Sequence, residues 1–180
     1  MLAHDLLVLD LLRIPAPPTG EADLRPLLGE DPDQLARIYL EGYPPGVAAA
    51  DLAQARAEMA LTLTGGYGVL RPDASLVAYD GGAAVGAVFT VERSIWDADL
   101  PGPFVIDLVV VPGARGRGTG RALLGGAVRA CARAGEKTLS LRTGGGTSAA
   151  AAHLYRELGF RPPCRGVPLA VNAMGGTSPS

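Results

Sequence analysis

The stretch Arg115-Gly116-Arg117-Gly118-Thr119-Gly120-Arg121 decides how this chain is interpreted. It follows an apolar run from Phe104 to Val111 that only Asp107 interrupts, and it precedes an amphipathic stretch from Ala122 to Ala134. This order predicts a buried strand, a tight glycine-rich turn and the start of a helix. Glycines let a ligand approach bare N–H groups, and a helix N-terminus adds unpaired donors and partial positive charge. The turn is therefore suited to a phosphate or pyrophosphate.

Two common phosphate-binding motifs do not fit this turn. A P-loop ends in Gly-Lys-Ser/Thr, and no such triplet follows here. The dinucleotide fingerprint is G-x-G-x-x-G. Gly116 and Gly118 match its first two glycines, but Arg121 stands where the third is required.

A third pattern does fit the turn. Arg115-x-x-Gly118-x-Gly120, behind the strand-like Leu108–Pro112, resembles the acyl-CoA-binding motif of the GNAT superfamily of N-acetyltransferases.

A second feature of the same family follows at the expected distance. Residues 148–160 match the family pattern Asn-x-x-Ala-x-x-Leu-Tyr followed by Gly-Phe, except that Ser148 replaces the asparagine. The resemblance covers about residues 22–170 and is strongest over 104–160. Two motifs in the right order, on the expected strand and helix, are far more specific than one glycine-rich turn.

Composition is that of one soluble globular domain. The chain has 180 residues, of which 48% are hydrophobic and 19% charged. No apolar run approaches the length of a membrane span, and the patch Leu6–Leu9 lacks the cationic leader of a signal peptide. Cys131 and Cys164 make no disulfide framework, and Cys131 is expected to be a buried thiol. A reducing cytoplasm is the expected location.

Charge is distributed unevenly although the net charge is only −2. Residues 1–100 hold 15 acidic and 6 basic side chains, a balance of −9, whereas residues 101–180 hold 3 and 10, a balance of +7. The cationic half suits a ligand with several phosphates, and the acidic half suits a cationic acceptor such as an amine. Chance together with helix solvation is the alternative explanation.

The order of expected elements predicts an α/β (α+β) sandwich around one mixed, mostly antiparallel sheet flanked by about four helices. Residues 8–14 are compatible with an extra strand or a short helix. We divide the chain into an N-terminal extension (1–21), a GNAT-like domain (22–174) and a flexible tail (175–180). Strands are expected at 24–28, 67–71, 76–79, 85–91, 104–111, 138–141 and 169–174, and helices at 31–42, 48–64, 119–134 and 149–158.

The resemblance implies how acetyl-CoA would bind. The central strand and the strand after it should separate, opening a slot for the pantetheine arm, which would pair with main-chain groups of the central strand by β-augmentation. Main-chain N–H groups of the turn would hold the pyrophosphate. A serine at position 148 offers one donor where the family asparagine offers two. The expected cofactor-binding residues are Val109, Val111, Arg115, Gly116, Arg117, Gly118, Thr119, Gly120, Arg121 and Ser148.

The resemblance also suggests the catalytic groups. Tyr155 matches the family's usual general acid, placed to protonate the leaving thiolate. Its alternative role is that of a core tyrosine, since apolar residues flank it at helical spacing.

Asp107 is the only charge in the central strand, and strand alternation puts it on one sheet face with Val105 and Val109. Some family members carry a carboxylate there that removes the amine's proton through water. The alternative is a carboxylate that is hydrogen-bonded near a bulge. Three other carboxylates are rival bases: Glu92, Asp97 and Asp99.

These observations predict an N-acetyltransferase that moves an acetyl group from acetyl-CoA to a primary amine by direct transfer in a ternary complex. Three alternatives stay open: a non-catalytic acyl-CoA-binding or sensor module, a nucleotide-binding protein, and an interaction domain. The acceptor would be a small-molecule or peptide amine, and a homodimer is compatible with the family. His4 and His153 lack metal-ligand spacing, so no metal is expected. Clustered arginines without interleaved aromatics argue against nucleic-acid binding, and no membrane partner is expected.

Overall fold

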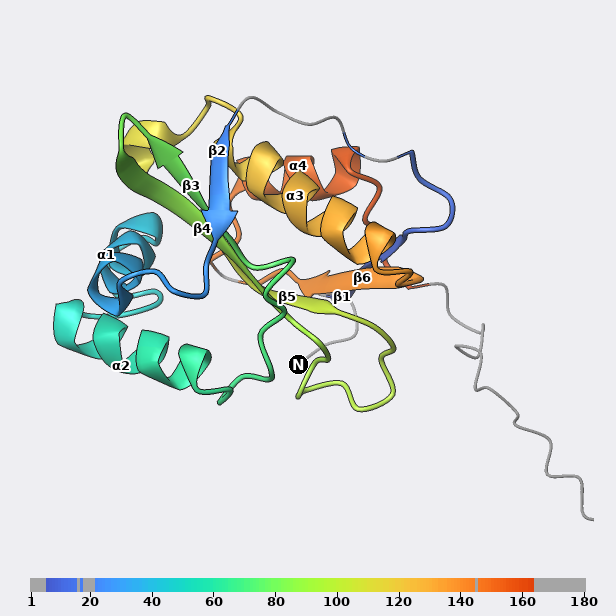
Figure 1. Ribbon diagram of the computed structural model, residues 1–180, viewed down its shortest axis with the longest axis horizontal. Coiled ribbons are helices and arrows are strands. Elements are labelled where there is room, and N and C mark those ends of the chain that lie inside the picture. Colours follow the sequence, from blue (N-terminus) through green and yellow to red (C-terminus); the bar gives the residue numbers. More distant parts are fainter. Residues whose placement is uncertain (1–5, 16, 18–21, 145, 164–180) are drawn as a thin grey trace, which may run out of the picture.

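Six strands form one mixed sheet through the centre of the protein, in the order β1-β6-β5-β4-β3-β2 (Figure 1). The computed structural model describes residues 6–15, 17, 22–144 and 146–163. The expected strand at 169–174, the tail, His4 and Cys164 lie outside these ranges. In chain order the elements are β1 (Leu6–Asp10), β2 (Asp23–Pro26), α1 (Pro32–Gly42), α2 (Leu52–Leu63), β3 (Leu76–Asp80), β4 (Ala83–Val91), β5 (Phe104–Val110), a 3₁₀ turn (Pro112–Ala114), α3 (Thr119–Arg133), β6 (Thr138–Arg142) and α4 (Ala149–Glu157).

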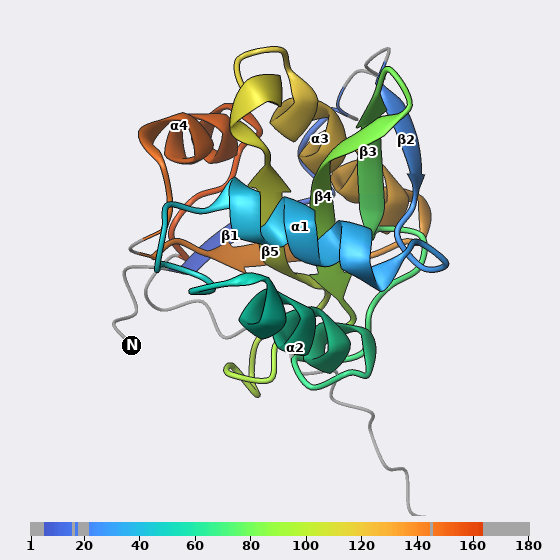
Figure 2. The same ribbon diagram turned by 90° about the vertical axis from the view of Figure 1, so that its left-hand side faces the viewer.

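The sheet is antiparallel except where β5 pairs with β6. Helices α1 and α2 cover one face of the sheet, and α3 and α4 cover the other (Figures 1 and 2). The predicted fold class, a mixed and mostly antiparallel sheet flanked by four helices, is therefore confirmed. Of residues 8–14, for which the sequence allows a strand or a helix, residues 8–10 belong to strand β1, which lies at the edge beside β6, and residues 11–14 follow it as a turn.

Two elements differ from expectation. The strand expected at 67–71 is reduced to one isolated bridge between Leu70 and Val91, because Gly68 adopts a left-handed φ of 108° that a continuous strand does not allow. Helix α2 begins at Leu52 because the side chain of Asp51 accepts a hydrogen bond from the Gln54 N–H and caps the helix there.

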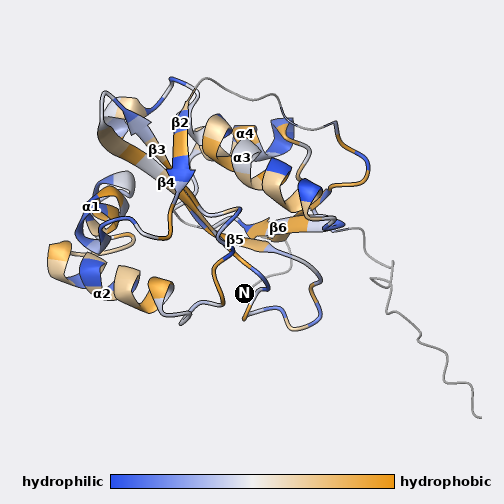
Figure 3. Ribbon diagram, in the orientation of Figure 1, coloured by the Kyte–Doolittle hydropathy of each residue, from blue (hydrophilic) through white to orange (hydrophobic). Residues whose placement is uncertain are grey.

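Each face of the sheet has its own hydrophobic core, and the hydrophobic colouring runs along β4 and β5 between the helix layers (Figure 3). Gly126 lets helix α3 pack closely on the sheet. A Cβ added at this position would lie 2.6 Å from the Leu76 side chain, which is too close for any larger residue to fit without a shift. Cys131 lies in this core, as expected of a buried thiol, and burial raises its pKa to about 12. The second core lies under α1 and α2.

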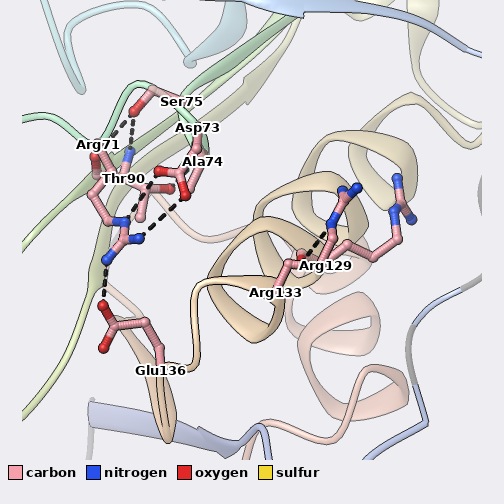
Figure 4. Close-up of polar contacts among 8 residues, drawn as sticks. All are labelled: Arg71, Asp73, Ala74, Ser75, Thr90, Arg129, Arg133 and Glu136. Atoms are coloured by element: carbon pink, nitrogen blue, oxygen red, sulfur yellow. Dashed lines mark hydrogen bonds and ion pairs between the residues drawn. The ribbon is translucent and has the colours of Figure 1, made fainter.

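A polar cluster fastens the turn before β3 to the segment that follows α3 (Figure 4). The guanidinium of Arg71 contacts Asp73 at 3.2 Å and Glu136 at 2.5 Å. Next to it the hydroxyl of Thr90 donates to the Ala74 carbonyl at 2.9 Å, and the hydroxyl of Ser75 donates to the Thr90 carbonyl. These contacts lie at the end of the sheet away from the glycine-rich turn.

A β-bulge in the central strand β5 determines which way Asp107 points. Phe89 lies opposite Asp107, but the next residue, Thr90, lies opposite Val105, so Ile106 is the extra residue. Val105 consequently packs in the core of α3 and α4, whereas Val109 packs in the core of α1 and α2. The expectation that Asp107 shares a face with Val105 is wrong, because a bulge interrupts strand alternation.

Candidate active site

A large cavity opens where β5 and β6 separate. The two strands pair only at Phe104–Ser140 and Val105–Leu141. Beyond that point lies a cavity of about 900 Å³, lined by the far half of β5, the glycine-rich turn, the segment before α4 and one side of α4. The predicted separation of the two strands is thus present. A volume of this size falls within the range of small-molecule and cofactor sites.

The turn presents free main-chain donors to this cavity. Gly116 and Gly118 have φ values of 74° and 84°, and Gly118 stands at the N-cap of α3 without any side-chain cap. Within the described part of the chain, no hydrogen bond uses the main-chain N–H groups from Gly116 to Arg121. A Cβ added at either glycine would meet nothing within 4 Å, so the space in front of the turn is open. The turn therefore fits a pyrophosphate.

The three arginines of the motif are already engaged with protein groups. Arg115 donates to the Val110 carbonyl at 3.0 Å and to the Gly42 carbonyl at 2.7 Å. Arg117 contacts Asp80 on the exposed surface at 3.3 Å and does not line the cavity. Arg121 does line it and pairs with Glu157 of α4.

These contacts give the arginines different roles. Arg115 braces the end of β5 against the end of α1, so its guanidinium acts on the protein itself. Arg115 and Arg121 both line the cavity but are engaged with protein groups, whereas the main-chain amides of the turn are left as unpaired donors suited to an anion.

The register of β5 shows which main-chain groups face the gap. Val111 donates its N–H to the Val85 carbonyl, so its main chain faces β4. Alternation along an antiparallel pair turns Val109 the same way. Leu108 and Val110 face the opposite direction, and they line the cavity, whereas Val109 and Val111 do not. Main-chain groups of Leu108 and Val110, offset by one position from the expected Val109 and Val111, therefore face the gap.

Tyr155 lies on α4, at the boundary between the core and the cavity. Its ring packs edge-on against Phe160 at 6.1 Å in the core, and the side chain also lines the cavity. Among the described residues no hydrogen bond involves its hydroxyl. Burial raises its pKa to about 12, with a further contribution from Asp107. A phenol with this pKa stays protonated at neutral pH and can donate a proton.

Ser148 positions the helix that carries Tyr155. Its hydroxyl oxygen accepts a hydrogen bond from the Ala151 N–H at 3.1 Å and so caps α4. Ser148 also lines the cavity. Its hydroxyl thus serves the helix in the free protein.

Asp107 lines the cavity and contacts the residue that ends α1. The hydroxyl of Tyr43, the C-cap residue of α1, donates to its carboxylate. Burial raises the pKa of Asp107 to about 6, against the opposing effects of the Tyr43 hydroxyl and the Leu108 N–H. Burial likewise raises the pKa of Tyr43, so the phenol remains the donor. Asp107 is ionised at neutral pH but holds a proton more strongly than an ordinary carboxylate.

The three rival carboxylates lie elsewhere. Glu92 and Asp99 are exposed and line neither cavity described for this protein. Asp97 is paired with Arg142 and accepts a hydrogen bond from Ser94 at 2.9 Å. Burial acts to raise the pKa of Asp97, but these two partners outweigh it and bring the pKa below its ordinary value. Asp107 is the only one of the four that lines the cavity.

Sequence reasoning missed the aromatic side chains that surround Asp107. Tyr39 and Tyr43 lie on successive turns of α1 with ring centroids 5.5 Å apart, and both line the cavity. Their i, i+4 spacing was visible in the sequence, but it resembles that of an ordinary apolar helix face. Glu58, Tyr67 and Trp96 line a smaller neighbouring cavity and belong to no motif.

Within the described ranges, no group of three or more His, Cys, Asp or Glu side chains is arranged to hold a metal ion. No helix in the same ranges has both the length and the hydropathy needed to cross a bilayer. His153 is exposed and lies 3.6 Å from Glu157, at the rim of the large cavity.

Comparison with solved structures places this architecture among acetyltransferases. A GCN5-related N-acetyltransferase from Sphaerobacter thermophilus superposes with a TM-score of 0.64 at 21% identity, over 87% of this chain and 47% of that chain. A Pyrococcus horikoshii OT3 protein superposes with a TM-score of 0.65 at 21% identity, over 82% of this chain and 94% of that chain. The aminoglycoside N-acetyltransferase AAC(6')-Iy, solved with CoA, superposes with a TM-score of 0.59 at 17% identity, over 87% of this chain and 98% of that chain. The chain thus spans less than half of the Sphaerobacter protein.

Sequence comparison identifies the family. No curated protein sequence matches the chain. The family model described as "Acetyltransferase (GNAT) domain" matches residues 71–162, which include β5, the glycine-rich turn and the helix carrying Tyr155. That match covers half of the chain, and it agrees with both sequence motifs. The chain therefore belongs to the GNAT family of acetyltransferases.

Proposed function

We propose that this protein transfers an acetyl group from acetyl-CoA to a primary amine by direct attack in a ternary complex. One observation carries the proposal: a single cavity is lined by the free amides of the turn, the phenol of Tyr155 and the carboxylate of Asp107. An anion-binding turn, a proton donor and a proton acceptor are the groups that this reaction requires.

The cofactor site is built from main-chain groups. The amides from Gly116 to Arg121 would hold the pyrophosphate at the start of α3. The pantetheine arm would extend along the free edge of β5, where Leu108 and Val110 face the gap. The Arg115 side chain already donates to the Val110 carbonyl. The Val110 N–H would then be the group that donates to the pantetheine arm or to the thioester carbonyl. Acetyl-CoA supplies an acyl group activated as a thioester.

Asp107 is suited to accept the amine's proton. A free alkylamine has a pKa near 10.4 and must lose a proton before it can attack. A carboxylate whose pKa is about 6 is ionised at neutral pH and is a stronger base than an ordinary aspartate. The Tyr43 hydroxyl orients this carboxylate from the side of α1.

Tyr155 is suited to protonate the leaving thiolate. Its hydroxyl lines the same cavity and stays protonated up to high pH because its pKa is about 12. A thiolate leaves more readily when it receives a proton. In this proposal Tyr155 and Asp107 divide the acid and base roles within one cavity.

The test is release of free CoA from acetyl-CoA in the presence of a panel of primary amines. Tyr155→Phe is expected to lower kcat by about 10²–10⁴-fold, the usual contribution of a general acid, and to leave the calorimetric Kd for acetyl-CoA unchanged. Tyr79→Phe is the matched control, because Tyr79 donates to Glu30 and lines neither cavity.

Two results would contradict the proposal. Acetyl-CoA binding without turnover on any amine would instead support a non-catalytic acyl-CoA-binding module. A stable acetylated form of the enzyme, detected by mass spectrometry before amine is added, would exclude direct transfer.

A further inference from the structure

A second, smaller cavity lies beside the first and meets it at Asp107. It has a volume of about 160 Å³, and Tyr39, Ile106 and Asp107 line both cavities. Residues of α1, α2, β4 and the loop between β4 and β5 form its walls. A molecule whose reacting group lay next to Asp107 would therefore have this space directly available to the rest of its structure.

The walls of the smaller cavity favour a cation. Among the residues that the structure describes, the only charged ones in its lining are two carboxylates, Glu58 and Asp107. The rings of Tyr67 and Trp96 are stacked with centroids 6.1 Å apart. Aromatic faces next to a carboxylate attract ammonium groups, and no basic residue of the lining opposes them. Burial chiefly raises the pKa of Tyr39, and both carboxylates add to it, so this ring lies within the field of each.

Glu58 retains capacity for a ligand. One of its oxygens, Oε2, accepts a hydrogen bond from the Tyr67 hydroxyl at 2.7 Å. Within the described ranges its other oxygen, Oε1, takes part in no hydrogen bond or ion pair. The Tyr67 contact fixes the carboxylate against the aromatic wall, and Oε1 is left to accept from a bound ammonium.

The position of Trp96 is also built into the fold. Its main-chain N–H donates to the Ser94 hydroxyl at 3.2 Å, and that hydroxyl donates to Asp97 at 2.9 Å. Asp97 in turn pairs with Arg142 at the end of β6. This chain of contacts fastens the loop that carries Trp96 to the sheet, although the indole itself is 47% exposed.

We infer that the smaller cavity binds a second ammonium group of the acceptor, so that the preferred acceptors are diamines. This inference rests on the proposed function. One amine would lie next to Asp107 to be acetylated, and the second would lie between Glu58 and the rings of Tyr67 and Trp96. A cavity of about 150 Å³ admits a benzene molecule, so this cavity has room for about six non-hydrogen atoms. A short aminoalkyl arm is of that size.

The test compares 1,4-diaminobutane with butylamine, which has the same carbon chain and one ammonium fewer. In wild-type protein, kcat/KM for the diamine is expected to be at least about tenfold higher, the effect of one charge-assisted hydrogen bond. Glu58→Gln should remove this preference by raising KM for the diamine. Glu92→Gln is the control, because Glu92 is exposed and lines neither cavity. Trp96→Leu, at a half-exposed site, should weaken the diamine preference independently of Glu58.

A binding measurement separates this inference from the proposed function. Trp96 is the only tryptophan in the chain, so its fluorescence reports on the smaller cavity without acetyl-CoA and without turnover. Saturable quenching by 1,4-diaminobutane that Glu58→Gln weakens would support the cation site even if no amine were acetylated. Equal acetylation of both amines, unaffected by Glu58→Gln and Trp96→Leu, would overturn the inference and leave the acetyltransferase function standing.

Discussion

Replacing Asp107 by asparagine is expected to make the protein more stable at neutral pH while it removes transfer activity. Burial raises the pKa of this carboxyl group from 3.8 to about 6. The folded chain therefore binds this proton more tightly than the unfolded chain, and the free energy of unfolding decreases as the pH rises between these values. The decrease amounts to about 3 kcal/mol once both states are ionised. Asparagine has a similar shape, can still accept from Tyr43 and carries no charge to desolvate.

The effect has a defined pH dependence. The stability gained by Asp107→Asn should be roughly 1.5 kcal/mol at pH 5 and should reach up to about 3 kcal/mol at pH 8. Urea unfolding of the ligand-free protein, followed by circular dichroism at each pH, measures it. Asp99→Asn is the control, since Asp99 is exposed and a surface change of this kind stays within about 0.5 kcal/mol.

The activity of the same variants completes the test. Wild-type kcat/KM should fall as the pH drops through about 6, because protonation removes the base, and the asparagine variant should be low and flat over that range. The reasoning is refuted if Asp107→Asn is no more stable than wild type at pH 8, or if its advantage is the same at pH 5 and pH 8.

Two further predictions concern the turn and the sheet. Gly118→Ala places a side chain at a φ of 84°, which costs about 1–2 kcal/mol in the left-handed region, so calorimetry should show acetyl-CoA binding weakened by about tenfold. Gly113→Ala is its control, because a Cβ there meets nothing within 4 Å and its φ is not left-handed. An equal loss of acetyl-CoA affinity in both variants would contradict the proposed role of the turn. Arg71→Met should lower the unfolding free energy by about 1–2 kcal/mol in urea titrations, since two acidic partners lose their donor. The exposed Arg25→Met should be nearly silent, and similar losses in both would argue against a special role for the Arg71 cluster.

Local sequence patterns were sufficient to predict the cofactor turn and the helices that flank it. The glycines at 116 and 118 need a backbone conformation that other residues rarely adopt, so they mark the turn without reference to the rest of the fold. Ser148 caps α4 and Tyr155 lies two turns further on, which is again a local relation. The resemblance to acetyltransferases rested on these segments, and for this reason it identified the family correctly.

Features that depend on distant segments were not predictable in the same way. Whether residues 6–10 form a strand depends on pairing with β6, which lies more than 120 residues further along the chain. The bulge at Ile106 depends on the register against β4, so strand alternation alone assigned Val105 to the wrong face. Tyr43 and Glu58 become site residues only because α1 and α2 pack beside β5. The division of the chain at residue 22 stays a prediction, although β1 is hydrogen-bonded within the sheet.

The contacts of Arg115 have a consequence for the energetics of recognition. Its guanidinium holds two main-chain oxygens, one on β5 and one at the end of α1, before any ligand arrives. A long, rotamer-rich side chain is therefore already immobilised in the free protein, and binding incurs no further entropy loss at this residue. Since Gly42 adjoins Tyr43, the same brace ties the glycine-rich turn to the residue that donates to Asp107. In the proposed reaction, one side chain that need not touch either substrate would thus preorganise both affinity and catalytic alignment.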